Sequence, residues 1–283
     1  MSKEKKNPGF DKNTSLATRM KTYEAITTET KLIERLPIYC RVDMRAGHSF
    51  CRGLDKPFDK DYTNAMRAAT SYIVEETGAV VGYTQSDEAS FVYLDDTKIP
   101  FGTRLFKLES VIASMFTGAF YKACLGTKLE KKVWKILPTF DARFLNLPSL
   151  SEAANMILWR EKDSIKNSIT LLALEHFSDK RIHGKNSNEK IEMLHDIGVF
   201  YYSMAQDLRN GAYFRREVYD KILSKEELAK IPEKQLANLK KNNNGEYVVT
   251  RSHVVQFFLG TELMKIENKE GVLFNREEAI LKV

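Results

Sequence analysis

Two adjacent acids, Asp87 and Glu88, interrupt the apolar and β-branched stretch YTQSDEASFVYL at residues 83–94, and a third acid, Asp43, ends the strand-like stretch PIYCRVD. Taken alone, an acid pair at a hairpin tip is usually a solvated turn. If the fold brings all three acids together, their like charges repel, and each carboxyl resists ionisation unless a cation lies between them. Carboxylates on adjacent strand ends hold two Mg²⁺ ions about 3.5 to 4 Å apart in enzymes that displace phosphoryl or nucleotidyl groups in line.

Basic residues follow Asp43 in the stretch DMRAGHSFCRGLDKPFD, namely Arg45, His48, Arg52 and Lys56. Such a cluster suits the charge of phosphate groups, although His48 fits a packed or surface histidine equally well. Neither GxxxxGK nor GxGxxG occurs, so neither a P-loop nor a dinucleotide-binding Rossmann site is supported, and HxxxH zinc spacing is also absent. These residues favour a metal-dependent reaction at a phosphate group.

Strand and helix patterns alternate around these residues. Strands are expected at 37–43, 78–84, 89–94 and 139–145, because apolar, β-branched and aromatic residues dominate there. One helix is expected from a cap at Asp59 or Asp61 to Gly78, and another over about 104–124, since apolar residues recur at helical spacing. The order βαββαβ predicts an α+β fold with the ferredoxin-like, split-βαβ pattern over about 37–147.

This topology brings the acids together. The first two strands run parallel through a right-handed helical crossover, and the third returns antiparallel between them. The end of the first strand and the turn joining the next two therefore share one edge of the sheet. We expect Asp43 to lie close to Asp87 and Glu88.

The rest of the chain shows weaker patterns. We expect a flexible segment at 1–15, a weakly helical pattern from Ser15 to Thr30, a first domain at 16–148 that contains the split-βαβ pattern, and a mainly helical region at 149–283. The stretches SLSE at 149–152 and SKEE at 224–227 are capping boxes that begin helices. A polar turn at 242–246 precedes a short strand at 246–251.

Composition bounds the class of protein. The chain has 283 residues, 43% of them hydrophobic, which suffices for a sizeable core, and a net charge of +6 that mildly favours polyanionic partners. Three cysteines without CxxC spacing indicate neither a disulfide framework nor a zinc site. Without an apolar run of about 18 residues or a signal peptide, the sequence predicts a cytoplasmic protein with no membrane association.

Several segments resemble the tRNA-His guanylyltransferase family and its relatives, the guanylyltransferase-like 3′-to-5′ RNA polymerases. The resemblance spans about 15–216. Its motifs, in chain order, are RVDMRAGHSF, KPFD at 56–59, TQSDEASFVY, FDAR at 140–143, WREKD at 159–163 and EML at 192–194.

The resemblance implies a polymerase-type palm as the catalytic domain at 16–148, and contacts with RNA, nucleotide and other subunits in the region 149–283. It also implies roles for single residues. Asp43, the backbone carbonyl of Met44, and Asp87 would bind two Mg²⁺ ions, with Glu88 assisting and His48 close to the reacting RNA 5′ end. The nucleotide triphosphate, ATP or GTP, would be bound by Arg45, Lys56, Ser86, Asn167 and Lys190. The implied reaction joins the 3′ hydroxyl of an incoming nucleotide to an adenylylated or triphosphorylated 5′ end of tRNA.

The sequence departs from the family pattern at two places. Met44 replaces the usual glycine of DGR, which a backbone carbonyl ligand tolerates. The family's HINNLYN segment reads IKNSITL, with Ile165 and Ser168 in place of its first histidine and second asparagine. This pattern is closer to bacterial and viral relatives, and it puts template-directed repair of tRNA 5′ ends on an equal footing with tRNA-His guanylation.

Other functions stay open at this stage. A nucleotide cyclase or dinucleotide synthase carries similar acids on a similar palm, and an RNA-binding relative could have lost activity. Arg215 and Arg216 suit RNA phosphate or a solvated charge pair equally well. The family resemblance also implies a homotetramer.

Overall fold

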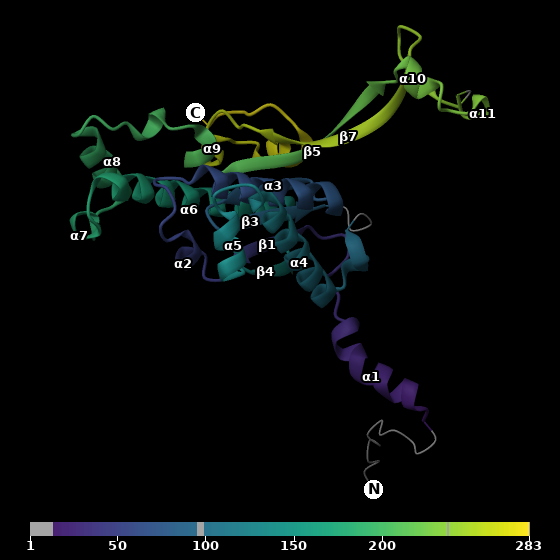
Figure 1. Cartoon of the computed structure of the whole chain (residues 1–283), viewed down its shortest axis with the longest axis horizontal. Helices are drawn as coiled ribbons and strands as arrows, with labels where there is room; N and C mark the ends of the chain where they lie inside the picture. The colour runs from purple at the N-terminus through teal and green to yellow at the C-terminus, as the bar shows by residue number, and fades with distance from the viewer. Residues whose placement is uncertain (1–13, 95–98, 237, 283) are drawn as a thin grey trace.

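The computed structural model describes residues 14–94, 99–236 and 238–282. In this part of the chain seven strands form one antiparallel sheet, in the order β4-β1-β3-β2-β5-β7-β6 (Figure 1). Their bounds are β1 (Ile38–Met44), β2 (Val81–Gln85), β3 (Glu88–Tyr93), β4 (Phe140–Asn146), β5 (Ala212–Ile222), β6 (Lys240–Lys241) and β7 (Tyr247–Phe257).

Helices cover both faces of this sheet. The longer ones are α1 (Leu16–Thr28), α3 (Lys60–Thr77), α4 (Leu105–Cys124), α6 (Leu150–His176) and α8 (Ser187–His195). The shorter ones are α2 (Gly47–Cys51), α5 (Glu130–Ile136), α7 (Asp179–Ile182), α9 (Gln206–Arg209), α10 (Lys225–Leu228) and α11 (Glu233–Leu236). Single turns lie at η1 (Pro100–Thr103), η2 (Tyr201–Ser203), η3 (Leu263–Lys265) and η4 (Gly271–Asn275).

The predicted βαββαβ palm is confirmed as β1-α3-β2-β3-α4-β4. Strand β3 lies antiparallel between β1 and β2, which therefore point the same way. The local signals act as expected: Asp59 caps α3 by accepting a hydrogen bond from the Tyr62 amide, and Gly78 ends it at φ 74°. The palm sheet also crosses the domain boundary expected after residue 148, because β5 pairs with β2.

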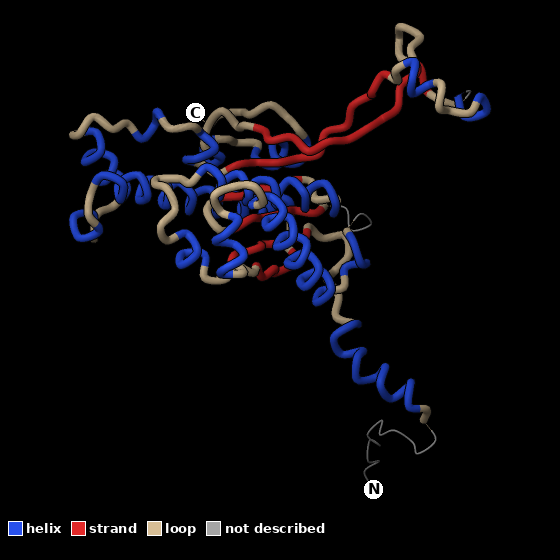
Figure 2. Tube along the Cα trace, in the orientation of Figure 1, coloured by secondary structure: helices blue, strands red, loops and turns tan. Residues whose placement is uncertain are grey.

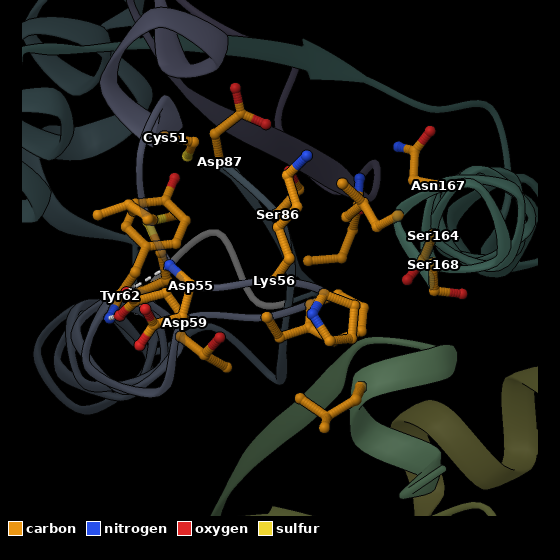
Figure 3. A pocket seen from close by; sticks show the side chains of 18 of the residues that line it. Cys51, Asp55, Lys56, Asp59, Tyr62, Ser86, Asp87, Ser164, Asn167 and Ser168 are labelled. Atoms are coloured by element: carbon orange, nitrogen blue, oxygen red, sulfur yellow. Dashed lines mark hydrogen bonds between the residues drawn. The ribbon is translucent and has the colours of Figure 1, made fainter. Parts of the chain in front are cut away.

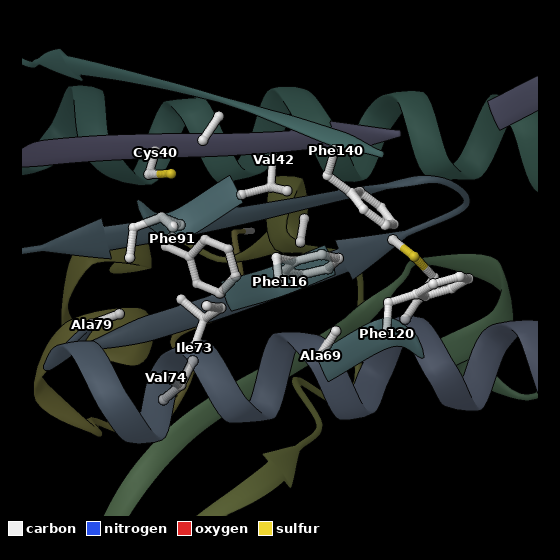
Figure 4. Packing of buried hydrophobic residues seen from close by; sticks show 14 of the residues in the cluster. Cys40, Val42, Ala69, Ile73, Val74, Ala79, Phe91, Phe116, Phe120 and Phe140 are labelled. Atoms are coloured by element: carbon white, nitrogen blue, oxygen red, sulfur yellow. The ribbon is translucent and has the colours of Figure 1, made fainter. Parts of the chain in front are cut away.

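Two cores lie on opposite faces of the palm sheet. Figure 4 shows one of them, where Phe91 of β3 and Phe140 of β4 meet Ile73 of α3 and Phe116 of α4. On the other face α6 buries Ala153, Ala154 and Ile157 against tyrosines of β1 and β2. Because β2 and β3 are buried on both faces, their sequences show strong apolar patterns.

The C-terminal portion holds more helix than strand, as expected, with α6 alone spanning 27 residues. The sequence patterns did not indicate β5, however, and showed only the start of β7. These two strands form a ribbon that projects beyond the body of the protein (Figure 2). Its outer part is exposed, so no alternation of apolar and polar residues marks it.

Other expectations for the flanking segments hold in part. Ser15 caps α1. Of the flexible segment expected at 1–15, residues 1–13 lie outside the described residues. Ser149 caps α6 by accepting from the Glu152 amide, and Ser224 and Glu227 form a full capping box, although α10 has only four residues. None of the helices described here is both long and apolar enough to cross a bilayer.

A buried carboxylate, Glu161 of α6, joins three distant segments. Its Oε1 accepts hydrogen bonds from Asn210 Nδ2 at 3.2 Å and the Tyr213 hydroxyl at 3.1 Å, and its Oε2 accepts from the Leu263 amide at 2.8 Å. Glu161 has no exposed surface, and burial raises its pKa from 4.5 to about 7 in spite of these donors. Glu161 therefore holds β5 and η3 onto α6, and its contribution to the free energy of unfolding depends on pH.

The free energy of unfolding should fall as pH rises from about 4.5 to about 7, by up to about 3 kcal/mol from this group. The folded state binds the proton of Glu161 in this range while the unfolded state has lost it. Urea unfolding at several pH values measures the slope. Glu161→Gln should remove this contribution, and Glu152→Gln at an exposed position of the same helix should not; equal slopes in all three proteins would contradict the prediction.

Candidate active site

The strand register places the three predicted acids together. Asp43 at the end of β1 lies directly opposite Glu88 of β3, and the Met44 amide donates a hydrogen bond to the Asp87 carbonyl at 3.0 Å. Burial raises the pKa of Asp43, and the negative charge of Asp87 raises it further. The expected repulsion between carboxyl groups is thus present at this edge of the sheet.

The carboxylate of Asp87 lies directly against the backbone of Gly47, the first residue of α2. A Cβ atom at position 47 would lie 1.9 Å from Asp87 Oδ2 and 2.7 Å from its Cγ. Only glycine therefore leaves room for this orientation of the acid.

We expect Gly47→Ala to lower the rate of a reaction that depends on the Asp87 carboxylate about 100-fold, because the added methyl group must push this carboxylate aside by about 1 Å or more. Gly118→Ala is the matched control: no atom lies within 4 Å of a Cβ placed there, and alanine suits the interior of α4. Single-turnover rates of both variants test this. Equal rates in the Gly47 variant and the wild type would contradict it.

Glu88 makes a different contact from the other two acids. It is 8% exposed, and its Oε1 accepts from Arg160 Nε of α6 at 2.5 Å. Arg160 also donates to Asp163 at 2.6 Å and lies over the Trp159 ring at 4.4 Å. Burial raises the pKa of Glu88, and Arg160 opposes that shift. This ion pair holds the β2–β3 turn, which carries Asp87, onto α6; assistance by Glu88 in catalysis stays a prediction.

A cavity of about 480 Å³ adjoins Asp87, within the range of volumes that suit a nucleotide. Its walls come from the loop after β1, the first half of α3, the β2–β3 turn, α6 and the segment at 207–211. Figure 3 shows Asp87 and Tyr62 at one side, Lys56 and Ser86 in the middle, and Asn167, Ser164 and Ser168 of α6 at the other side.

The predicted site residues divide into two groups. Those that line the cavity are His48, Lys56, Ser86, Asp87 and Asn167. The described cavity wall does not include Asp43, Met44, Arg45, Glu88 or Lys190. The Arg45 amide donates to the Thr139 carbonyl at 2.9 Å, and Lys190 of α8 donates to the Thr170 hydroxyl of α6 at 3.0 Å. Their roles toward a nucleotide stay predictions.

The cavity wall also contains a charged pair that the sequence did not indicate. Arg67 Nη2 of α3 lies 2.9 Å from Asp207 Oδ2 in an ion pair, and Gln256 of β7 donates a hydrogen bond to that oxygen at 3.1 Å. Arg67 lies on the polar side of a predicted helix, and Asp207 falls in a segment without a pattern. Only the fold brings them together.

Asp43, Asp87 and the Met44 carbonyl are chemically suited to Mg²⁺, a hard cation that prefers oxygen ligands. Among the described residues no group of three or more His, Cys, Asp or Glu side chains is arranged to hold a metal ion. Mg²⁺ sites in nucleotide enzymes often contain one or two protein carboxylates, with water and substrate phosphates completing the shell. The acids present fit such a site.

A ferredoxin-like palm with paired acids at one sheet edge, beside a cavity of nucleotide size, is typical of palm-type enzymes that act on nucleotides. Residues 17–148 match the sequence profile of the family Thg1, tRNAHis guanylyltransferase. With the relatives described next, this match shows that the chain belongs to the tRNAHis guanylyltransferase family.

Solved structures and a curated relative agree with this family. A bacterial tRNA(His) guanylyltransferase (Thg1)-like protein in complex with ATP shares 32% identity at a TM-score of 0.64, over 72% of this chain and 87% of that one. A bacterial Thg1-like protein in complex with GTP shares 27% sequence identity at a TM-score of 0.62, over 86% of this chain and 91% of that one. The tRNA(His) guanylyltransferase of Candida glabrata is 28% identical over 64% of this chain and 83% of its own. The bacterial structures support the predicted likeness to bacterial members.

Proposed function

We propose that this protein adds nucleotides to the 5′ end of tRNA in the 3′-to-5′ direction, with Mg²⁺ and with ATP and GTP as substrates. The observation that carries the proposal is the meeting of Asp43 and Asp87 beside the cavity, in a chain of the tRNAHis guanylyltransferase family. The ATP and GTP complexes of the bacterial relatives support the choice of nucleotides.

The proposed roles combine the place of each side chain with the family resemblance. Asp43, Asp87 and the Met44 carbonyl would hold Mg²⁺, which would supply charge neutralisation and lower the pKa of a bound hydroxyl. Lys56 and Ser86 line the middle of the cavity, where Lys56 balances triphosphate charge. Asn167 offers both a donor and an acceptor from α6 to the same nucleotide. Arg45 and Lys190 do not line the cavity, and their contacts with the nucleotide are proposed from the family resemblance alone.

The proposed step is an in-line displacement. The 3′ oxygen of the incoming nucleotide forms a bond to the 5′ phosphorus of the RNA, while the bond from that phosphorus to AMP or pyrophosphate breaks. His48 lines the same cavity as Asp87, which supports its proposed role at the RNA 5′ end. Because this displacement needs no covalent enzyme intermediate, it requires no nucleophilic Ser or Cys.

The other functions considered gain no support. The retained acids and cavity argue against a relative that has lost activity, and the family argues against a nucleotide cyclase. A cytoplasmic location fits the three free cysteines. The homotetramer remains a prediction.

An end-labelled tRNA assay tests the proposal. Full-length and 5′-truncated transcripts carrying a 5′ monophosphate are mixed with ATP, Mg²⁺ and each nucleoside triphosphate in turn. We expect extension at the 5′ end of at least one transcript, and EDTA should abolish it. Extension of truncated transcripts opposite every template base would indicate repair, whereas a single G on full-length tRNA-His would indicate guanylation. No addition to any transcript would overturn the proposal.

A further inference from the structure

Helix α5 carries an exposed aromatic side chain within a lysine-rich segment. From residue 122 to residue 137 the sequence holds five lysines and one glutamate. Trp134 is 57% exposed and forms part of a shallow hollow whose other lining residues are Thr127, Lys128, Glu130 and Lys131. Aromatic rings beside positive charges are the features on which single-stranded nucleic acids stack.

The ring and the cations here are available to a ligand. Tyr121 of α4 packs edge-on against Trp134, with ring centroids 5.5 Å apart at 80°, and so fixes its orientation. Lys131 and Lys135 are exposed and form no ion pair with any residue that the structure describes. Lys128, in contrast, binds Asp55 and Asp59. We call Lys131, Trp134 and Lys135 the α5 face.

Helix α5, which carries this face, adjoins the candidate active site. Lys132 Nζ of α5 donates to the Arg52 carbonyl at 2.7 Å and lies 5.3 Å from the centre of the Phe50 ring, so α5 packs against α2, the helix that carries His48. His48 lines the same cavity as Asp87, so α5 packs against an element of the cavity wall.

We propose that the α5 face binds the acceptor end of the substrate RNA, with one single-stranded base stacked on Trp134 and backbone phosphates on Lys131 and Lys135. This inference rests on the proposed function. RNA fits better than a second copy of this chain, because a two-fold contact would set these lysines against each other. Stacking on an aromatic ring accepts any base, and unpaired lysines supply charge to the phosphates.

Filter binding of 5′-monophosphorylated tRNA, with and without its 3′ single-stranded nucleotides, tests the inference. Trp134→Ala should weaken binding of the intact tRNA roughly 5- to 100-fold, whereas Trp134→Phe should keep most of the affinity. The trimmed tRNA should bind both variants and the wild type alike. Lys131→Ala with Lys135→Ala should lower the slope of log affinity against log salt by about 1.4, for two single-strand phosphates.

Several readouts separate this inference from its alternatives. KM for ATP and GTP and the thermal unfolding midpoint should not change, since the α5 face is exposed and outside the cavity wall. An exposed pair, Lys225→Ala with Lys230→Ala, is the matched charge control. If the wild type adds nucleotides but Trp134→Ala binds intact tRNA normally, or changes the oligomeric state instead, only this inference fails. If the wild type adds no nucleotide to any RNA, the proposed function fails.

Discussion

Asp87→Asn is expected to slow nucleotide addition at least about 1,000-fold, equivalent to about 4 kcal/mol of activation free energy. Asparagine keeps the size of the side chain, so its fit against Gly47 and the hydrogen bond from the Met44 amide to the carbonyl of residue 87 are unchanged. What is lost is the negative charge that neighbours Asp43 and that the proposed Mg²⁺ requires.

The thermal stability of this variant should equal or exceed that of the wild type, because removing the charge at position 87 relieves its repulsion of Asp43. Asp141→Asn is the matched control. Asp141 of β4 lies opposite Asp43 of β1, is exposed, and forms an ion pair with Arg143. Single-turnover rates with saturating tRNA and nucleotide give the comparison. Activity above a tenth of the wild-type rate in Asp87→Asn would remove this acid from the reaction.

The meeting of the acids could be predicted because it depends on topology alone. Strands β1 and β3 are marked by apolar residues that both cores bury, and their order fixes which ends lie at one edge. Asp43 and Glu88 then face each other whatever the side chains nearby. Family motifs added residues such as Lys56 and Asn167, which local patterns do not distinguish from ordinary surface residues.

The contacts that hold the site in place could not be predicted in the same way. Arg160 belongs to the motif WREKD, yet nothing in the helix pattern indicates that its side chain donates a hydrogen bond to Glu88, 72 positions earlier. Arg67 and Asp207 are likewise joined only by the folded chain. Strand β5 could not be predicted for a different reason. Its outer half is exposed on both faces, so burial does not impose an alternation of apolar and polar residues on its sequence.

Arg160→Met should destabilise the fold by about 3 to 5 kcal/mol, because it leaves the Glu88 carboxylate buried without its counter-charge. Methionine keeps much of the side-chain volume, so loss of packing contributes little. Arg143→Met is the matched control: the Arg143–Asp141 pair is more than half exposed on both sides, and such pairs contribute less than about 1 kcal/mol. Urea unfolding near pH 7 measures both variants.

The cause of the lost stability in Arg160→Met can be tested separately from its size. If an unpaired charge is responsible, the destabilisation in Arg160→Met should shrink as pH falls, because a protonated Glu88 needs no partner. The double variant Glu88→Gln with Arg160→Met should likewise recover part of the stability. A loss that is independent of pH and unchanged in the double variant would show that Arg160 acts through packing on Trp159 rather than through Glu88. The β2–β3 turn must then be held in place by other contacts, such as the hydrogen bond from the Met44 amide to the Asp87 carbonyl.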